Sequence, residues 1–332
     1  MKILFIITNL ASGGAERVCA TLANELSKEH EVEILYFKDE VFYELHSSVK
    51  LSLYKPKGRG IARIIDKMLK IRSKCDESDF TLSFMLSTNI LSIMSNLFSG
   101  NKIIISEHSQ HKFASLKWRV LRRIFYPFAH ALGVLSKQDF EFYNFVKNRA
   151  LIYNPTDCKP CFEAKKENLI IFVGRLERVK GCDIFLNALA LLDLRDFEVR
   201  ILGDGSLRQD LKQIAKNLGL NVNFLGNVKN VDEHYKSAKI IVSSSISEGL
   251  PMVLIESLFF DCIRVATPTT GAAELINDEI DGFLSSDFRA ENLALAIKKA
   301  MSASDEILTN ARTKCENFKA QNIAKKWLEL AK

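Results

Sequence analysis

Residues 240–256 read Ile-Ile-Val-Ser-Ser-Ser-Ile-Ser-Glu-Gly-Leu-Pro-Met-Val-Leu-Ile-Glu. The run Ile240–Ser243 is apolar, as buried strands of parallel sheets are, and Val253–Phe260 has the composition of a helix. Between them, Gly249 lets the backbone approach a ligand closely, and Pro251 suits a first helical turn, where no amide hydrogen is needed. This stretch therefore predicts a strand, a loop that faces a ligand, and a helix whose first amides favour anions.

The same alternation of strands and helices extends over the chain. Predicted strands are Lys2–Thr8, Glu31–Phe37, Phe80–Phe84, Lys102–Ser106, Ala131–Leu135, Leu151–Tyr153, Leu169–Val173, Glu198–Leu202, Val222–Phe224, Ile240–Ser243 and Cys262–Ala266. Predicted helices include Lys55–Lys74, Asp183–Leu192, Leu207–Leu218, Val231–Ser237, Val253–Phe260, Asn292–Ala303 and Ala320–Leu330. Asn154-Pro155 and the charged stretch Asp157–Asn168 interrupt the pattern, so we expect two doubly wound α/β units. In such units ligands bind beyond the carboxyl ends of the strands, and we expect the site in a cleft between the two.

Charge and cysteine content narrow the function classes. The net charge is +6, and residues 1–155 hold 22 Lys+Arg against 15 Asp+Glu, which indicates either an anionic partner or a merely soluble basic face. The seven cysteines are scattered, unlike a secreted disulfide framework, and the Cys158–Cys161 pair stands alone, which argues against zinc. No apolar run approaches the ~18 residues of a spanning helix. We expect a cytoplasmic protein whose first residues are a strand and a glycine loop, not a signal peptide.

Four charged residues stand at or after predicted strand ends, where a ligand would bind. Glu248 and Glu256 can hold hydroxyl groups of a sugar and a ribose, and Arg175 and Lys180 follow a predicted strand end, where a phosphate would lie. Surface ion pairing is the alternative for the two cations. The segment Gly203-Asp-Gly-Ser-Leu-Arg lacks the complete GxGxxG pattern, which disfavours dinucleotide binding.

The spacing of Glu248 and Glu256 resembles the EX7E motif of retaining glycosyltransferases of family 4. Phe172–Gly181 and Gly13-Gly-Ala-Glu-Arg17 are also similar to segments of that family. The resemblance covers nearly the whole chain and implies the GT-B fold, two Rossmann-like domains that face each other across a cleft. It implies an N-terminal acceptor-binding domain of residues 1–157 and 317–332 and a nucleotide-sugar-binding domain of residues 158–316.

The resemblance also implies roles for individual residues. His108 and Glu248 are expected to be catalytic, although a structural histidine is the alternative for His108. The donor diphosphate is expected at Gly14, Arg175 and Lys180. The donor sugar and nucleoside are expected at Glu248, Gly249, Leu250, Pro251, Met252, Val253, Glu256 and Val228. No paired-aspartate metal motif follows a strand, and His108 with His111 is too weak a pair, so we expect no metal and no other cofactor.

A basic stripe is predicted on the helix of residues 55–74. At about 100° per residue, its cations fall within an arc of roughly 80°, opposite Ile61, Ile64, Ile65, Met68 and Ile71. The stripe is either a solvated face or a site for the pyrophosphate of an acceptor at an anionic membrane surface. Its members are Arg59, Arg63, Lys67, Lys70 and Lys74.

The stripe and the segment Trp118–Pro127 resemble bacterial N-glycan pathway transferases. This implies transfer of N-acetylgalactosamine from UDP-GalNAc to a polyprenyl-diphosphate-linked oligosaccharide, by an enzyme peripheral on the inner face of the cytoplasmic membrane. Alternatives are a lipopolysaccharide or capsule glycosyltransferase with another donor, and a non-catalytic protein that binds nucleotide sugars. A nucleic-acid-binding protein is disfavoured, because no aromatic residue interleaves with the stripe.

Overall fold

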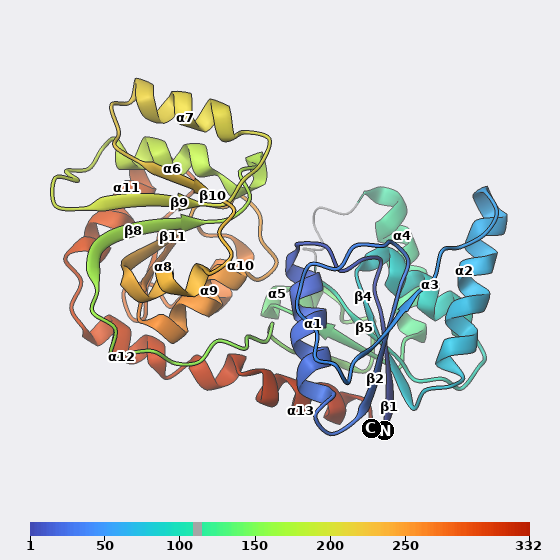
Figure 1. The fold of residues 1–332 in the computed structure, drawn as a ribbon. Coiled ribbons are helices and arrows are strands. Elements are labelled where there is room, and N and C mark those ends of the chain that lie inside the picture. Colours follow the sequence, from blue (N-terminus) through green and yellow to red (C-terminus); the bar gives the residue numbers. More distant parts are fainter. Residues whose placement is uncertain (109–114) are drawn as a thin grey trace. The chain divides into compact units, whose positions relative to one another are not determined.

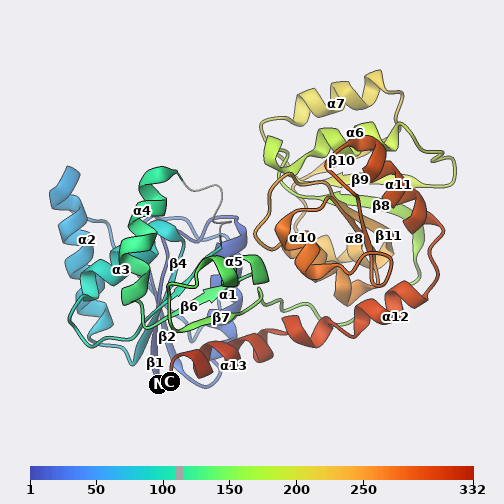
Figure 2. The same cartoon turned by 180° about the vertical axis from the view of Figure 1, so that it is seen from behind.

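The computed structural model describes residues 1–108 and 115–332. This part of the chain divides into two compact units, Met1–Asp157 with Asn317–Lys332, and Cys158–Glu316. Each unit is a parallel sheet with helices on both faces (Figures 1 and 2). The predicted class, two doubly wound α/β units, is confirmed.

The sheet of the first unit has seven strands in the order β3-β2-β1-β4-β5-β6-β7. It forms around strands that are apolar on both faces, since Ile3, Leu4 and Phe5 of β1 are each at most 2% exposed. The direction of the strand order reverses between β1 and β4, so the loop after β1 lies at a switch point where ligands bind in such sheets. The strands are β1 (Lys2–Ile6), β2 (Glu31–Tyr36), β3 (Lys50–Leu53), β4 (Phe80–Phe84), β5 (Ile103–Ser106), β6 (Ala131–Val134) and β7 (Arg149–Leu151).

Helices cover both faces of this sheet. α2, α3 and α4 lie together on one face, where Ile71 of α2, Ile90 of α3 and Trp118 of α4 join one core (Figure 1). α13 packs beside α1 on the other face, and a Cβ atom at Gly133 of β6 would lie 2.1 Å from the ring of Trp327, so only glycine fits under that ring. The helices are α1 (Gly14–Leu26), α2 (Gly60–Cys75), α3 (Leu86–Asn96), α4 (Leu116–Phe125), α5 (Lys137–Phe142) and α13 (Ala320–Leu330).

The second unit has six strands in the order β10-β9-β8-β11-β12-β13. Its switch point lies between β8 and β11, so the loops after these two strands are neighbours. Its strands are β8 (Glu167–Val173), β9 (Glu198–Leu202), β10 (Asn223–Gly226), β11 (Ala238–Ser243), β12 (Ile263–Ala266) and β13 (Phe283–Leu284). Its helices are α6 (Cys182–Leu189), α7 (Arg208–Asn217), α8 (Val231–Ser237), α9 (Met252–Glu256), α10 (Thr270–Leu275), α11 (Ala290–Met301) and α12 (Glu306–Arg312).

Some elements differ from the prediction. The helix predicted from Lys55 begins at Gly60, because Gly58 and Gly60 have φ angles of 82° and 55°, which end regular structure before them. The edge strand β3 was missed, since its four residues alternate between polar and apolar and are too few to give a pattern. The short strand predicted at Leu151 begins at Arg149 as β7. Helices α3, α4, α5, α10 and α12 and strand β13 were not predicted either.

Candidate active site

Two loops at the switch point of the second unit are locked together. A Cβ atom at Gly181, where φ is 60°, would lie 2.1 Å from the carbonyl oxygen of Ser244. The Ser244 hydroxyl donates to the Gly181 carbonyl at 2.8 Å, and the Ile246 amide donates to the Val179 carbonyl at 2.9 Å. The loop after β8 and the loop after β11 therefore form one rigid surface at the carboxyl edge of the sheet.

This surface brings Lys180 and Glu248 together. The Lys180 ammonium forms an ion pair with Oε1 of Glu248, and the Ser245 hydroxyl donates to the same oxygen at 3.1 Å. Both charged side chains keep contact with solvent, with 24% of Lys180 and 18% of Glu248 exposed. Lys180, predicted to bind the diphosphate, and Glu248, predicted to bind the sugar, are thus in direct contact at a place that solvent can reach.

Arg175 lies exposed on the same loop after β8. Hydrogen bonds from the amide and the hydroxyl of Ser206 hold the pKa of Glu177 below its usual value, with a smaller contribution from the charge of Arg175. Glu177 therefore stays a carboxylate that ties this loop to the start of α7, while the guanidinium of Arg175 is open to a ligand from solvent.

Glu256, the last residue of α9, is buried against α8. Its side chain is 3% exposed, and the hydroxyl of Tyr235 on α8 donates to Oε2 at 3.0 Å. The ring of Tyr235 is fully buried and stacks on Phe260 with centroids 5.6 Å apart. Sequence reasoning missed Tyr235, because nothing in its helix distinguishes it from an ordinary core tyrosine.

The segment between Glu248 and Glu256 packs against the start of α10. A Cβ atom at Gly271, at the start of α10, would lie 2.4 Å from the Gly249 carbonyl oxygen, so the helix supports this loop directly. Pro251 immediately precedes α9 and is not in its first turn, which corrects the prediction, and α9 has only five residues before a 3-10 turn follows. Leu250 and Pro251 are buried, while half-buried Met252 and Val253 begin the helix.

The loop that carries Val228 lies at the neighbouring strand end. Val228 is half-buried between β10 and α8. The Gly203 amide donates to the Gly226 carbonyl at 2.7 Å, and a Cβ atom at Gly203 would lie 1.9 Å from the Gly174 carbonyl oxygen. The ends of β8, β9 and β10 are therefore in close contact, and the Val228 loop continues the surface that holds Arg175.

In the first unit, the glycine loop after β1 leads into α1. Gly14 is the exposed first residue of α1, and a Cβ atom there would meet no atom of the described chain within 4 Å. Tyr43 fixes the preceding residue, because its hydroxyl donates to the Gly13 carbonyl at 2.9 Å. The start of this 13-residue helix is thus open and held in place.

His108 follows β5 in the same unit. Its ring stacks on Phe84 with centroids 5.7 Å apart, and its Nε2 lies 2.9 Å from the Ser106 hydroxyl. Burial lowers the pKa of His108 to about 4, so the imidazole is neutral near pH 7. A neutral ring can exchange hydrogen bonds with a sugar hydroxyl but supplies no positive charge. His111 lies outside the described residues.

The predicted basic stripe is divided in the structure. Arg59 precedes α2 with extended backbone, and Arg63 is exposed in its first turns. Lys67 and Lys70 lie over aromatic rings of the sheet side, with Lys67 3.7 Å from the centroid of Phe37 and Lys70 5.5 Å from that of Tyr54. Burial, and then repulsion from Arg63, lower the pKa of Lys67 to about 8.

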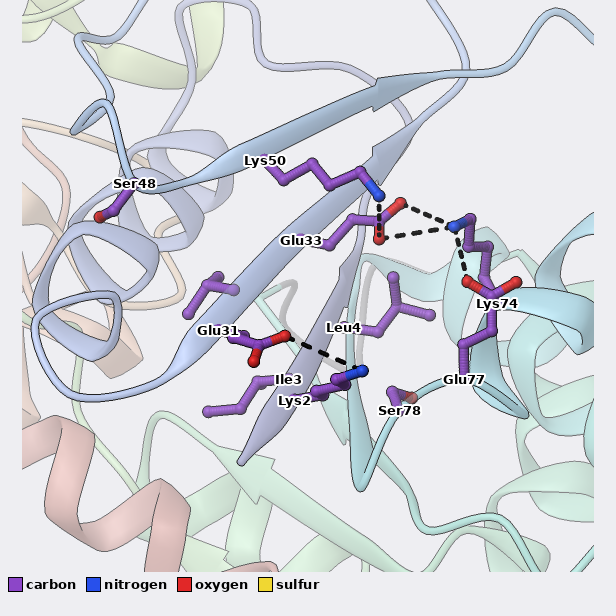
Figure 3. A pocket seen from close by; sticks show the side chains of 11 residues that line it. Lys2, Ile3, Leu4, Glu31, Glu33, Ser48, Lys50, Lys74, Glu77 and Ser78 are labelled. Carbon is purple, nitrogen blue, oxygen red and sulfur yellow. Dashed lines mark hydrogen bonds and ion pairs between the residues drawn. The ribbon is translucent and has the colours of Figure 1, made fainter.

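Lys74 belongs to a different environment, shown in Figure 3. Its ammonium pairs with Glu33 at 3.1 Å and with Glu77 at 2.8 Å, in a pocket of about 520 Å³ that also contains Lys2 and Lys50. Burial alone would raise the pKa of Glu33, but hydrogen bonds from Ser52 and Lys74 hold it below its usual value. Lys74 is thus committed to two carboxylates, Glu33 on β2 and Glu77 shortly before β4. The first residues of β1 and β2 line the same pocket, away from the strand ends where ligands bind.

The apolar side of α2 also departs from a simple amphipathic helix. Only Ile71 and Cys75 are buried, whereas Ile61, Ile64 and Ile65 are 76%, 47% and 51% exposed. The first half of α2 projects away from the sheet (Figure 2). In this half, Arg63 is exposed together with these three isoleucines, whereas Lys67 lies over Phe37.

Residues 1–108 and 115–332 contain no group of three or more His, Cys, Asp or Glu side chains that could hold a metal ion. None of their helices is long and apolar enough to cross a membrane.

Comparison with known proteins identifies the family. A model of the family described as "Glycosyl transferases group 1" matches residues 156–321. A Campylobacter jejuni protein, GalNAc-α-(1→4)-GalNAc-α-(1→3)-diNAcBac-PP-undecaprenol α-1,4-N-acetyl-D-galactosaminyltransferase, is 40% identical over 99% of this chain and 98% of its own length. A second protein of that organism, N-acetylgalactosamine-N,N'-diacetylbacillosaminyl-diphospho-undecaprenol 4-α-N-acetylgalactosaminyltransferase, is 30% identical over 98% of this chain and 97% of its own.

Solved structures share the fold. The crystal structure of Anabaena Alr3699/HepE in complex with UDP superposes with a TM-score of 0.86, covers 99% of both chains and is 19% identical. These matches agree with the structure of the second unit, in which the loops after β8 and β11 interlock and bring Lys180 and Glu248 together. The chain is a glycosyltransferase of the GT-B fold and belongs to the glycosyl transferases group 1 family.

Proposed function

We propose that this enzyme transfers N-acetylgalactosamine from UDP-GalNAc, with retention of the α configuration, to a glycan linked through diphosphate to undecaprenol. The observation that carries the proposal is the surface of the second unit on which Lys180 pairs with Glu248, together with the buried Glu256 that follows on α9. The relative that is 40% identical is named as an α-1,4-N-acetylgalactosaminyltransferase that acts on such a lipid-linked glycan, which supports both the sugar and the acceptor.

The chemistry that we propose follows from the leaving group. Arg175 and Lys180 bind the donor diphosphate, with Gly14 of the first unit, and Lys180 exchanges its partner Glu248 for a phosphate oxygen. Glu248 then becomes available to hold a sugar hydroxyl. The bond from the anomeric carbon to the β-phosphate oxygen breaks while the acceptor oxygen bonds to the same face of that carbon. The acceptor's hydroxyl proton passes to an oxygen of the departing phosphate, so no separate acid is required.

Other residues orient the donor in this proposal. Glu256 accepts hydrogen bonds from the ribose, the Val228 loop contacts the base, and Gly249 to Val253 line the sugar. Neutral His108 exchanges a hydrogen bond with the sugar and carries no charge, as its environment beside Phe84 and Ser106 favours. Since cationic side chains can neutralise the diphosphate, we propose that no metal or other cofactor is needed. Turnover should survive excess EDTA, and a loss that Mg²⁺ or Mn²⁺ restores would contradict this.

We propose that Arg59, Arg63, Lys67 and Lys70 bind the acceptor's pyrophosphate. These cations span about three turns, so they can offer a diphosphate successive positions while the lipid tail stays in the bilayer. Lys74 was predicted to belong to this site, and its pairs with Glu33 and Glu77 now separate it from the others. The enzyme would work as a peripheral protein on the anionic cytoplasmic face of the membrane and would bind no nucleic acid.

A screen of donors against acceptors tests the proposal. Purified enzyme is incubated with each common nucleotide sugar and with one of two acceptors, the lipid-linked glycans in the names of the two Campylobacter jejuni relatives, which differ by one GalNAc. Product masses and anomeric proton couplings are recorded. We expect mass gains of N-acetylhexosamine only with UDP-GalNAc, and an α coupling. Transfer of another sugar would favour the lipopolysaccharide or capsule alternative. An Erwinia amylovora protein named as an amylovoran biosynthesis glycosyltransferase is 26% identical over 99% of this chain. Binding without transfer would refute catalysis.

A further inference from the structure

α4 carries large apolar side chains on its outer side. Leu116, Val120 and Ile124 are 75%, 49% and 51% exposed. Their spacing of four residues keeps them within an arc of about 80° on the helix surface. Phe128 continues this outer side just beyond the helix, at 61% exposure. Soluble surfaces carry single exposed apolar residues, but a continuous row of them marks an interaction site.

Cations accompany this apolar row, and acidic residues are absent from it. Lys117, Arg119 and Arg123 are all exposed on α4. The sequence from Ser115 to His130 contains no Asp or Glu. An apolar row with basic flanks is the composition of helices that lie in the interface of an anionic bilayer, with the apolar side chains below the headgroups and the cations among them.

The inner side of α4 fixes which side chains face outward. Arg122 and Glu107 form an ion pair at 3.3 Å in which their side chains are 3% and 1% exposed. The Tyr126 hydroxyl donates to the same carboxylate oxygen of Glu107 at 2.7 Å. Rotation of α4 to bury Val120 and Ile124 would pull these paired charges apart, which is costly in a buried site. The outward apolar row is therefore a fixed feature of the fold.

We propose that α4 inserts into the anionic leaflet of the membrane, with Leu116, Val120 and Ile124 among the acyl chains and Lys117, Arg119 and Arg123 at the phosphates. The net positive charge of this surface favours anionic lipid over a second copy of the same chain, whose α4 would repel it. α2 packs on the other side of α3 and also exposes apolar residues in its first half, so a bilayer could contact both helices. The inference deepens the proposed function, in which the acceptor is anchored in a membrane.

The decisive experiment is vesicle co-sedimentation of the full chain. Vesicles are made of phosphatidylcholine alone or of phosphatidylcholine mixed with phosphatidylglycerol. The test variant is Val120→Ser with Ile124→Ser, and the matched control is Leu191→Ser with Leu295→Ser, both 59% exposed in the second unit. We expect the wild type and the control to bind mixed vesicles, and the test variant to bind at least about tenfold more weakly. Thermal melting verifies that each variant is folded.

A fluorescent probe placed in the row offers a second readout on α4 itself. Trp118 packs against the core of the first unit, and Trp327 on α13 is 2% exposed, so both native tryptophans give a constant background. Ile124→Trp adds an indole to the outward row. Mixed vesicles should shift the emission of this variant to shorter wavelength and leave the emission of the wild type unchanged. An equal shift in both proteins would mean that the lipid acts elsewhere.

Several outcomes would overturn the inference. Equal binding of mixed vesicles by the wild type and by the Val120→Ser, Ile124→Ser variant would remove α4 from the membrane. A dimer in sedimentation velocity that only this variant loses would assign the surface to a second copy of the chain. Failure of the proposed function is distinguishable, because vesicle binding is measured without substrates. If both proposals hold, the variant should keep its turnover on a water-soluble short-chain acceptor and lose it on undecaprenyl acceptor in vesicles.

Discussion

Replacement of Tyr235 by Phe tests whether a buried hydrogen bond prepares the donor site. The phenol donates to Oε2 of Glu256 at 3.0 Å, and the carboxylate is 3% exposed. A hydrogen bond to a charged group contributes about 1.5–3 kcal/mol, so the free energy of unfolding should fall by about that amount. The stacking of residue 235 on Phe260 would persist, because only the hydroxyl is removed.

The effect on donor binding should be smaller than the effect on stability. A Glu256 side chain that has lost this hydrogen bond is held less firmly, and the ligand must immobilise it further, at about 0.5–1.5 kcal/mol. This cost corresponds to a dissociation constant for UDP roughly 2-fold to 10-fold higher. Calorimetric titration with UDP and with 2′-deoxy-UDP measures this, and the loss should shrink for the deoxy ligand if Glu256 binds the ribose. Urea unfolding gives the stability.

A matched control is Tyr143→Phe, which alters a fully buried tyrosine of the first unit and should leave the affinity for UDP unchanged. The reasoning is refuted if Tyr235→Phe loses stability as expected and binds UDP like the wild type, while Glu256→Gln loses UDP binding. In that case the hydroxyl of Tyr235 would support the fold without orienting the carboxylate for the ligand.

Three further predictions concern charged groups. Lys180→Ala and Arg175→Ala should each lower kcat/KM about 10²-fold, because the developing charge on the diphosphate loses a cation. The control Lys216→Ala, on the exposed side of α7, should leave kcat/KM unchanged. Wild-type turnover in both site variants would exclude the diphosphate site at Arg175 and Lys180. The pKa of His108 is about 4 in the folded protein and ~6.5 in the unfolded chain, so protonation favours unfolding as pH falls from about 6.5 towards 4. The His108→Asn variant should therefore lose less thermal stability than the wild type over this range. Melting temperatures that fall in parallel with pH in the two proteins would contradict this. Joint alanine replacement of Arg63, Lys67 and Lys70 should raise the KM for the lipid-linked acceptor about tenfold or more and leave the KM for the nucleotide sugar unchanged. Where several sugars are transferred, their number should also change. Unaltered acceptor kinetics and product length would mean that these residues form an ordinary solvated surface.

The sequence predicted those parts of the fold that depend on local patterns. Apolar runs located β1, β8 and β11, because a strand buried on both faces must be apolar throughout. The family-like segments then pointed to Lys180 and Glu248, which lie on separate loops. Their contact depends on the packing of Gly181 against Ser244, and a glycine that fits under another backbone has no local pattern to identify it.

Other features were hidden for the same reason. Spacing along the predicted helix placed five cations on one side. It could not show that Lys67 and Lys70 lie over the rings of Phe37 and Tyr54, or that Lys74 forms an ion pair with Glu33. These partners come from strands that are distant in sequence. The sequence also did not predict the outward row of α4. Apolar residues spaced four apart are normally expected to face the core, and only the buried ion pair of Arg122 with Glu107 shows that the opposite side of α4 faces inward.

The return of α13 to the first unit has a consequence for the order of events on the ribosome. Residues 158–316, the whole of the second unit, are synthesised before Trp327, so the first unit, whose strands are made first, lacks the ring that covers Gly133 until residue 327 has emerged. Until then the face of β6 under that ring is exposed to chaperones, proteases and other nascent chains. A chain that ends at residue 316 and has been released from the ribosome should thus contain a protease-resistant C-terminal half and a sensitive N-terminal half, although the sensitive half was synthesised first.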